Sequence, residues 1–198
     1  MALVLLNRDV PDTLVGVWKV EERIDDLLSL YPYLQIEIAK YKNVSKQLNK
    51  LCEYRLLYEM TGEGGLFVEH DMRGKPLLKN WNISMSDTRG YVAICLSKTR
   101  RVGVDIEYLS NRVSKIAERF IRTDEQARDV REQLLHWCAK ETVYKYYSDQ
   151  NLDYFEMRLK AFEMAAQGSV AVENLKNQET LLVSYLFMDE ALLTYSVG

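Results

Sequence analysis

Two acidic residues alternate with apolar residues in the segment Val102–Tyr108. If this segment is a strand, successive side chains point to opposite faces, so Asp105 and Glu107 share one face. The two carboxylates would then stand about 7 Å apart and repel each other when ionised. A hard cation such as Mg²⁺, which prefers oxygen ligands, would relieve that repulsion. The alternation alone fits either a metal site or an ordinary solvated strand face.

A third carboxylate lies in an expected helix. Glu141 and Lys145 are four residues apart, and residues at that spacing share a helix face. They fit a surface ion pair worth roughly a few tenths of a kcal/mol. However, Cys138 lies on the same face and Trp137 and Tyr144 lie on neighbouring rows, so this face is not expected to be purely solvated.

Hydrophobic spacing and capping patterns predict the elements that would position these residues. Helices are expected at residues 23–30, at 44–60, from the capping-box pattern at 123–126, and at 134–147. Strands are expected at residues 1–6, 66–69, 82–86, 91–96, 102–108, 181–187 and 191–197. Blocks of strands and helices therefore alternate, which predicts an α+β chain of two similar lobes, residues 1–101 and 102–198.

Arg55 lies on the apolar stripe of the second expected helix. A guanidinium on such a face needs an anionic partner, because burial of an unpaired charge is costly. An internal salt bridge and a ligand phosphate are equally compatible with this position.

Composition excludes several classes of protein. The net charge of −3 argues against non-specific nucleic-acid binding. No apolar run approaches the roughly 20 residues that span a bilayer, and the N-terminus lacks the features of a signal peptide. The cysteines have no metal or redox spacing, so they are expected to be reduced core residues of a cytoplasmic protein.

The chain contains two histidines, and neither lies in a nucleophile-elbow context such as GxSxG. A hydrolase triad is therefore not indicated. The glycines at 62, 64 and 65 lack the spacing of a dinucleotide-binding or Walker loop.

Four motifs resemble those of the 4′-phosphopantetheinyl transferases. Residues 103–107 are similar to the family's G-[IV]-D-x-E motif, and residues 137–145 to its W-x-x-K-E-x-x-x-K motif. Upstream, residues 73–76 resemble a GKP turn, and residues 82–88 resemble an N-[IV]-S-x-S-H segment. The motifs occur in the family's order.

The resemblance implies a pseudo-symmetric α+β fold of the surfactin-synthetase-activating type. Each lobe would be a small, mainly antiparallel sheet packed with helices, with coenzyme A in a cleft between the lobes. Asp105, Glu107 and Glu141 would hold Mg²⁺ against the coenzyme A pyrophosphate. Glu141 would also take the proton from a serine of an apo acyl or peptidyl carrier protein, and Lys145 would neutralise charge on the phosphates. Catalysis would thus rest on Glu141, Lys145 and Asp105.

The resemblance also implies contacts to the nucleotide of coenzyme A. They would come from Lys46, Arg55, Lys75, Ser86, Asp87, Lys140 and Lys145. Lys46 stands where the family usually has arginine, so the charge is kept but the planar fork is lost. Asp87 stands where the family usually has histidine. An ionised aspartate repels the 3′-phosphate of coenzyme A, unless Arg89 or Lys75 pairs with it or the donor lacks that phosphate.

The function expected from the sequence is transfer of the phosphopantetheine arm from coenzyme A to a carrier-protein serine, releasing 3′,5′-ADP. The alternative is a non-catalytic or weakened homologue that binds carrier protein or nucleotide. Neither nucleic acid nor membrane is expected as a partner. Two lobes within one chain would build the cleft, so a monomer is expected.

Overall fold

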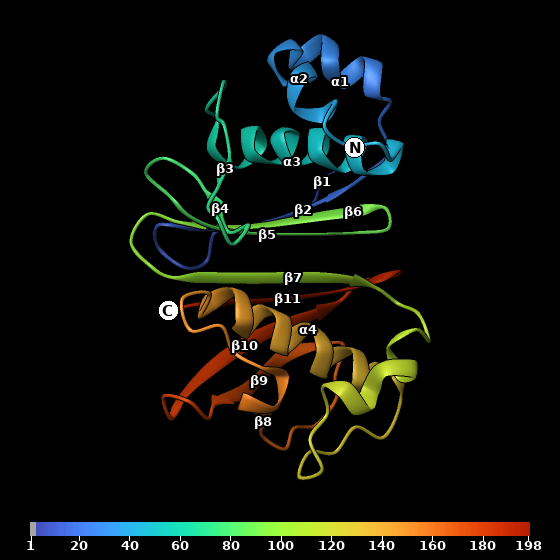
Figure 1. Cartoon of the computed structure of the whole chain (residues 1–198), viewed down its shortest axis with the longest axis vertical. Helices are drawn as coiled ribbons and strands as arrows, with labels where there is room; N and C mark the ends of the chain where they lie inside the picture. The colour runs from blue at the N-terminus through green and yellow to red at the C-terminus, as the bar shows by residue number, and fades with distance from the viewer. Residues whose placement is uncertain (1–2) are drawn as a thin grey trace. The chain divides into compact units, whose positions relative to one another are not determined.

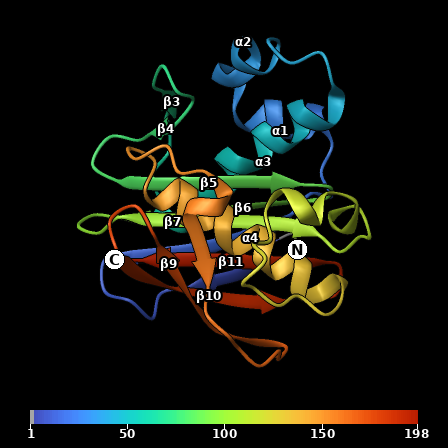
Figure 2. The ribbon, with the colours of Figure 1, turned by 60° about the horizontal axis from the view of Figure 1, so that its bottom comes forward.

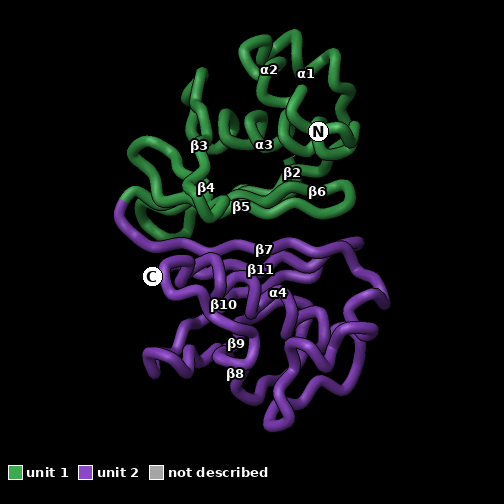
Figure 3. Tube along the Cα trace, viewed as in Figure 1, with its two compact units in different colours: residues 1–98 green, residues 99–198 purple. Residues whose placement is uncertain are grey.

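The computed structural model describes residues 3–198; Met1 and Ala2, at the start of the first expected strand, lie outside the described residues. The chain divides into two compact units, residues 1–98 and 99–198 (Figure 3). Each unit combines an antiparallel sheet with one long helix, which confirms the predicted α+β class. The prediction that residues 1–101 and 102–198 are independent domains stays a prediction.

Unit 1 is an antiparallel sheet in the order β1-β2-β6-β5, packed against a long helix (Figure 1). Its elements are β1 (Leu3–Asn7), β2 (Thr13–Lys19), α1 (Ile24–Leu30), η1 (Pro32–Leu34), α2 (Gln35–Ile38), α3 (Val44–Thr61), β3 (Glu69–His70), β4 (Pro76–Leu77), β5 (Asn82–Thr88) and β6 (Tyr91–Ser97). The side chain of Asn43 caps α3 by accepting hydrogen bonds from two backbone N–H groups. Gly62, with φ of 71°, ends the helix.

Unit 2 has the sheet order β7-β11-β10-β9-β8, again antiparallel throughout. Its elements are β7 (Val102–Tyr108), η2 (Val113–Arg119), α4 (Val130–Tyr146), η3 (Tyr154–Glu156), β8 (Met157–Leu159), β9 (Gln167–Asn174), β10 (Glu179–Phe187) and β11 (Ala191–Val197). Figures 1 and 2 show α4 lying against this sheet, where it packs on β7 and β11. The strand predicted at residues 102–108 is confirmed without change.

The helix predicted to begin at Thr123 does not form. Helix α4 begins at Val130 instead, capped by the side chain of Asp129, which accepts from the N–H of Glu132 at 2.9 Å. Within this stretch the carboxylate of Glu125 accepts from the ammonium of Lys140 at 2.7 Å and from the N–H of Leu159 at 2.6 Å, and so ties the segment to other parts of unit 2.

Other predicted boundaries also change. Of the strand expected at residues 66–69, only Glu69 lies in a strand, β3. β5 continues to Thr88, beyond its expected end. β2 was not predicted, because it is a central strand whose apolar residues lack the alternation of a half-exposed one. Val44, expected on the buried stripe of α3, is exposed at the helix start.

The main strands and the long helix are connected in the same order in the two units. The path β2-α3-β5-β6 in unit 1 and the path β7-α4-β10-β11 in unit 2 both place the last strand between the other two. In each path a glycine of the first strand allows the helix to approach. A Cβ on Gly16 would meet Leu56 and Met60, which are 12 and 16 residues after the first residue of α3 (56 − 44, 60 − 44).

In unit 2 the corresponding glycine is Gly103. A Cβ there would meet Thr142 and Tyr146, again 12 and 16 residues after the first residue of their helix (142 − 130, 146 − 130). The equivalence extends to charged residues: Arg55 and Glu59 of α3 match Glu141 and Lys145 of α4. The signs of the two pairs are reversed.

All three cysteines are free and buried, which confirms that they are small core residues. Within residues 3–198, no helix has the length and apolar character needed to cross a membrane.

Candidate active site

Helix α4 covers the acidic face of β7, so that Asp105 is buried and Glu107 is half-buried. Gly103 starts this face, and a Cβ on it would lie 2.4 Å from the carbonyl oxygen of Thr142. The missing side chain therefore lets the helix backbone pack directly on the strand. As a result Asp105, two residues further along the same face, is only 4% exposed. An ordinary solvated strand face is excluded.

Lys145 of α4 neutralises Asp105. Its Nζ donates to Asp105 Oδ1 at 2.7 Å and to the carbonyl oxygen of Val104 at 3.0 Å. The spacing of Glu141 and Lys145 also fitted a surface ion pair within the helix, but Lys145 instead makes a contact between helix and strand. The helix brings its cation to the strand carboxylate.

The other two carboxylates each accept a hydrogen bond from an aromatic residue. Trp137 Nε1 donates to Glu107 Oε1 at 3.3 Å, and the hydroxyl of Tyr154 donates to Glu141 Oε1. The Trp137 and Tyr154 rings also contact each other, with centroids 5.3 Å apart. The residues that donate to Glu107 and to Glu141 are therefore in contact with each other.

The electrostatics show that Asp105 lies near Glu141 and that Cys138 lies near both strand carboxylates. Burial raises the pKa of Glu141 and the negative charge of Asp105 raises it further, while the Tyr154 hydrogen bond and Lys145 lower it. Burial, followed by the charges of Asp105 and Glu107, holds the pKa of the Cys138 thiol well above its usual value. Asp105 is thus within electrostatic reach of Glu141, and Cys138 is within reach of both strand carboxylates.

These residues supply the oxygen ligands that a divalent cation such as Mg²⁺ prefers. Burial is the largest cause of the raised pKa of Glu141, and repulsion by Asp105 adds to it. Such a cation would relieve that repulsion. Among residues 3–198, no three His, Cys, Asp or Glu side chains already form a metal-binding group. The chemistry of the set fits a hard cation, and Lys145, Trp137 and Tyr154 are among the side chains that contact it.

Lys140, expected to bind nucleotide, lies in the interior of unit 2. Its ammonium donates to the carbonyl oxygen of Phe120 at 2.6 Å, to Glu125 Oε2 at 2.7 Å and to the carbonyl oxygen of Tyr154 at 3.3 Å. These acceptors match the three N–H groups of a lysine ammonium. The contacts assign Lys140 to holding the loop before α4, and they give no support to a nucleotide contact.

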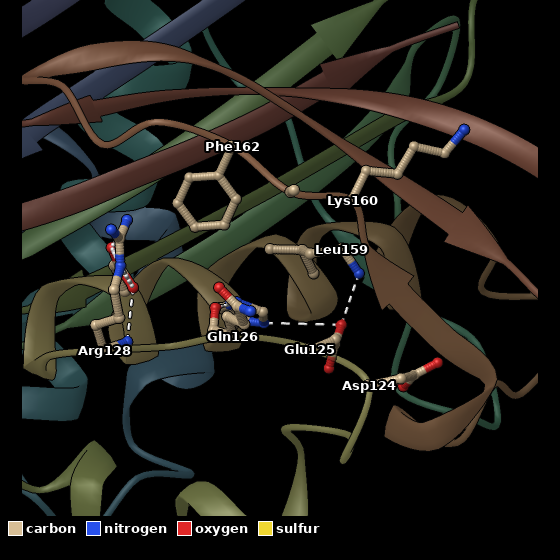
Figure 4. A pocket seen from close by; sticks show the side chains of 10 residues that line it. Asp124, Glu125, Gln126, Arg128, Leu159, Lys160 and Phe162 are labelled. Atoms are coloured by element: carbon tan, nitrogen blue, oxygen red, sulfur yellow. Dashed lines mark hydrogen bonds and ion pairs between the residues drawn. The ribbon is translucent and has the colours of Figure 1, made fainter.

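A hollow of about 190 Å³ lies beside this ion pair in unit 2 (Figure 4). At its base Glu125 accepts from the N–H of Leu159 at 2.6 Å. His136 Nε2 lies 3.1 Å from the carbonyl oxygen of Gln126, which requires the proton on Nε2 in the neutral ring. The other ring nitrogen, Nδ1, lies 3.7 Å from Glu125 Oε1.

Three of the expected nucleotide-binding residues line one hollow of about 230 Å³ in unit 1. They are Lys46, Ser86 and Asp87. Lys75 itself is exposed, and its neighbours Gly74 and Pro76 line the same hollow. The structure therefore brings these motif residues together, although they come from α3, β5 and the turn before β4.

The hollow contains charged residues that sequence reasoning missed. Lys50 is 6% exposed and its ammonium donates to Glu53 at 2.8 Å. Asp87 accepts a hydrogen bond from Asn49 Nδ2 at 2.8 Å, and not from the basic residues considered for it. Asn49 and Lys50 follow Lys46 by three and four residues, and Glu53 follows Lys50 by three and Asn49 by four. This spacing was the available signal that they share a face with Lys46.

Arg55 does not line this hollow. It is nine residues after Lys46, and nine residues turn an α-helix by about half a revolution, so the two side chains lie on opposite faces of α3. Its guanidinium pairs with Glu59 at 2.6 Å and lies over the rings of Trp18 and Tyr58, 5.6 and 5.8 Å from their centroids. The internal salt bridge is therefore the arrangement found for Arg55.

Comparison with known proteins adds one finding. Residues 101–194 match the family model described as the 4′-phosphopantetheinyl transferase superfamily. The matched region contains β7, α4 and the three carboxylates described above. A search of curated proteins finds no match.

Proposed function

Because residues 101–194 match the family model of the 4′-phosphopantetheinyl transferase superfamily, we propose that the chain moves the phosphopantetheine arm of coenzyme A to a serine of a carrier protein with the help of Mg²⁺. The family match indicates phosphopantetheinyl transfer in general. The metal, the donor and the acceptor are what we propose. The observation that carries the proposal is the burial of the Asp105 face of β7 beneath the helix that bears Glu141 and Lys145.

We assign the metal to Asp105, Glu107 and Glu141. When bound, Mg²⁺ would act as a Lewis acid on the donor's pyrophosphate and offset its charge. Two observations support this assignment. The charge of Asp105 acts on Glu141, and all three carboxylates differ from surface acids in being buried or half-buried. Trp137 and Tyr154 would hold Glu107 and Glu141 in place through the hydrogen bonds that they donate.

The reaction proceeds by attack of the serine oxygen on the β-phosphorus of coenzyme A. A new oxygen–phosphorus bond forms, the bond to the bridging oxygen breaks, and its electron pair leaves with 3′,5′-ADP. Glu141 takes the serine proton as general base. In the metal-free chain, burial raises the pKa of this carboxyl. Lys145 brings a positive charge to the phosphates, where negative charge builds up.

The hollow of unit 1 is assigned to the nucleotide of the donor. Lys46 and Lys75 are exposed cations at or beside it, and Ser86 lines it. Neither Arg55 nor Lys140 is assigned to the nucleotide, because both are used in contacts within their own units.

The test is incubation of the purified chain with coenzyme A, Mg²⁺ and a panel of apo acyl and peptidyl carrier proteins, followed by intact-mass measurement. We expect the mass of the arm to appear on the carrier's serine, and to be lost on chelation of the metal. Glu141→Gln is expected to lower the rate by about 10²-fold or more, as for loss of a general base. Glu163→Gln, an exposed glutamate outside the site, is the control.

Absence of the added mass across the whole panel would contradict the proposal. Titration calorimetry then separates the alternatives, since a non-catalytic homologue binds carrier protein or nucleotide without turnover.

We also propose that the protein acts in the cytoplasm as a monomer. The free cysteines support a reducing compartment. Sedimentation velocity tests the oligomeric state.

A further inference from the structure

The charges around the hollow of unit 1 are nearly balanced. Lys50 is buried and paired with Glu53, and the exposed Lys46 shares the hollow with Asp87. Two lysines therefore face two carboxylates, beside the polar groups of Asn49 and Ser86. His70 also lines the hollow, and burial lowers the pKa of its ring, which favours the neutral form. A site that selects phosphate carries an excess of cations, which this hollow lacks.

Asp87 is held in a defined position at this hollow. Its Oδ2 accepts from Asn49 of α3 at 2.8 Å. Among the residues that the structure describes, Asn49 is the side chain that donates to it, and Asp87 is exposed. The second carboxylate oxygen is thus available to accept a hydrogen bond from a ligand.

A carboxylate at such a position distinguishes a sugar hydroxyl from a sugar phosphate. In nucleotide sites an acidic side chain accepts from a ribose hydroxyl, whereas a basic side chain accommodates a phosphate on the same ring. A phosphate monoester carries close to two negative charges at pH 7. Beside an ionised aspartate, one such charge alone weakens binding by about 5- to 1000-fold, depending on solvent exposure.

We propose that the hollow of unit 1 binds a ribose with free hydroxyls, and that Asp87 selects 3′-dephospho-coenzyme A over coenzyme A as the donor. In this arrangement Asp87 accepts a hydrogen bond from the 3′-hydroxyl of the ribose. Lys46 and Lys50 lie near the sugar and the 5′-phosphate. The leaving group is then adenosine 5′-monophosphate. This inference rests on the proposed function, of which it changes only the donor.

The first experiment compares kcat/KM for the two donors with one apo carrier protein and Mg²⁺. We expect 3′-dephospho-coenzyme A to be preferred by at least about tenfold, from the repulsion given above. Equal use of the two donors, or preference for coenzyme A, overturns the inference but leaves the proposed transferase function intact.

Two substitutions test whether Asp87 causes the preference. Asp87→Asn keeps the shape and removes the charge, and Asp87→His adds a group that can pair with phosphate. Both are expected to reduce the preference by at least about tenfold, mainly by lowering KM for coenzyme A. The matched control is Asp9→Asn, because Asp9 also accepts from an asparagine amide, Asn7 Nδ2 at 2.9 Å, away from the hollow. An unchanged preference in both Asp87 variants overturns the inference.

A binding measurement keeps the two proposals apart if no transfer occurs from either donor. Calorimetric titration of the full chain with adenosine 5′-monophosphate and with adenosine 3′,5′-bisphosphate needs no turnover. Tighter binding of the monophosphate by about tenfold, reduced in Asp87→His, supports the inference even if the transferase function fails. Equal affinities, tighter binding of the bisphosphate, or no binding of either overturn it.

Discussion

Lys145 on α4 and Asp105 on β7 form an ion pair of 2.7 Å between a largely buried helix face and a buried strand face. The same ammonium donates to the carbonyl oxygen of Val104, so one side chain ties the helix to both backbone and side chain of the strand. The proposed metal site is therefore built into the packing of unit 2.

Removal of the Lys145 charge is expected to destabilise unit 2. Lys145→Met leaves Asp105 as a buried carboxylate without its cation, and we expect the free energy of unfolding in urea to fall by about 1–3 kcal/mol, less than for a fully buried pair. Adding Asp105→Asn to this variant should recover part of the loss. Lys176→Met, which removes an exposed lysine that donates to a carbonyl oxygen, is the control. No loss in Lys145→Met would show that the ion pair contributes nothing.

Mg²⁺ is expected to raise the thermal midpoint of the wild-type chain, because a ligand that binds only the folded state stabilises it. The increase should disappear in Asp105→Asn and in Glu141→Gln. Differential scanning fluorimetry checks this, with NaCl of equal ionic strength as the control for screening. The same increase in the two variants as in the wild type would rule out a metal site at these carboxylates.

Gly103 is expected to tolerate no side chain. In Gly103→Ala the new Cβ would lie 2.4 Å from a helix carbonyl oxygen, so α4 must move off the strand. We expect a loss of about 1–3 kcal/mol in unfolding free energy, as for other overpacked sites, together with loss of transfer activity. Gly64→Ala is the matched control, since a Cβ there would have no atom within 4 Å. Equal stability of the two variants would contradict the close approach.

The stability of the chain is expected to fall below neutral pH because of His136. Burial, the largest cause, lowers the pKa of this histidine below its ordinary value of 6.5. The unfolded chain therefore binds a proton before the folded chain does. Stability contributed by the neutral ring is present above pH 6.5 and is lost as the pH falls through the folded pKa.

His136→Gln is expected to flatten the pH dependence of unfolding free energy between pH 7 and the lowered pKa. The control is His70→Gln, which changes the other histidine, an exposed residue whose pKa is lowered in the same direction. The measurement is urea unfolding at a series of pH values. A larger flattening in His70→Gln than in His136→Gln would contradict this assignment.

Tyr154→Phe is expected to change the pH profile of transfer. The Tyr154 hydrogen bond lowers the pKa of Glu141, so its loss should raise that pKa and move the acidic limb of the rate profile to higher pH. The ring contacts with Trp137 and Phe120 are kept in the variant. The rate should therefore fall more at pH 6 than at pH 8, and an equal fall at both would indicate a purely structural role.

The sequence was sufficient to predict β7 and the carboxylates on it, because the alternation of apolar and acidic residues is local. It was not sufficient to predict their partners. Lys145 has Glu141 within its own helix, and only the docking of α4 on β7 decides that it contacts Asp105, 40 residues away in sequence. Contacts of this kind depend on packing between elements.

The failed helix start at Thr123 has a similar cause. The local pattern favours a cap there, but burial of Glu125 with Lys140 supplies three-dimensional contacts that a window of a few residues does not contain. Asn49, Lys50 and Glu53 were missed for the same reason. Their significance depends on β5, which brings Asp87 to them.

The charge pairs at equivalent positions of α3 and α4 are reversed, so we expect the two units to respond differently to divalent metal in the medium. In unit 1 the cation that pairs with Glu59 is the guanidinium of Arg55. As part of a side chain, it cannot dissociate into the medium. In unit 2 the matching position carries Glu141. Depletion of divalent metal from the medium should therefore loosen only one half of the molecule, and hydrogen exchange would show the difference unit by unit.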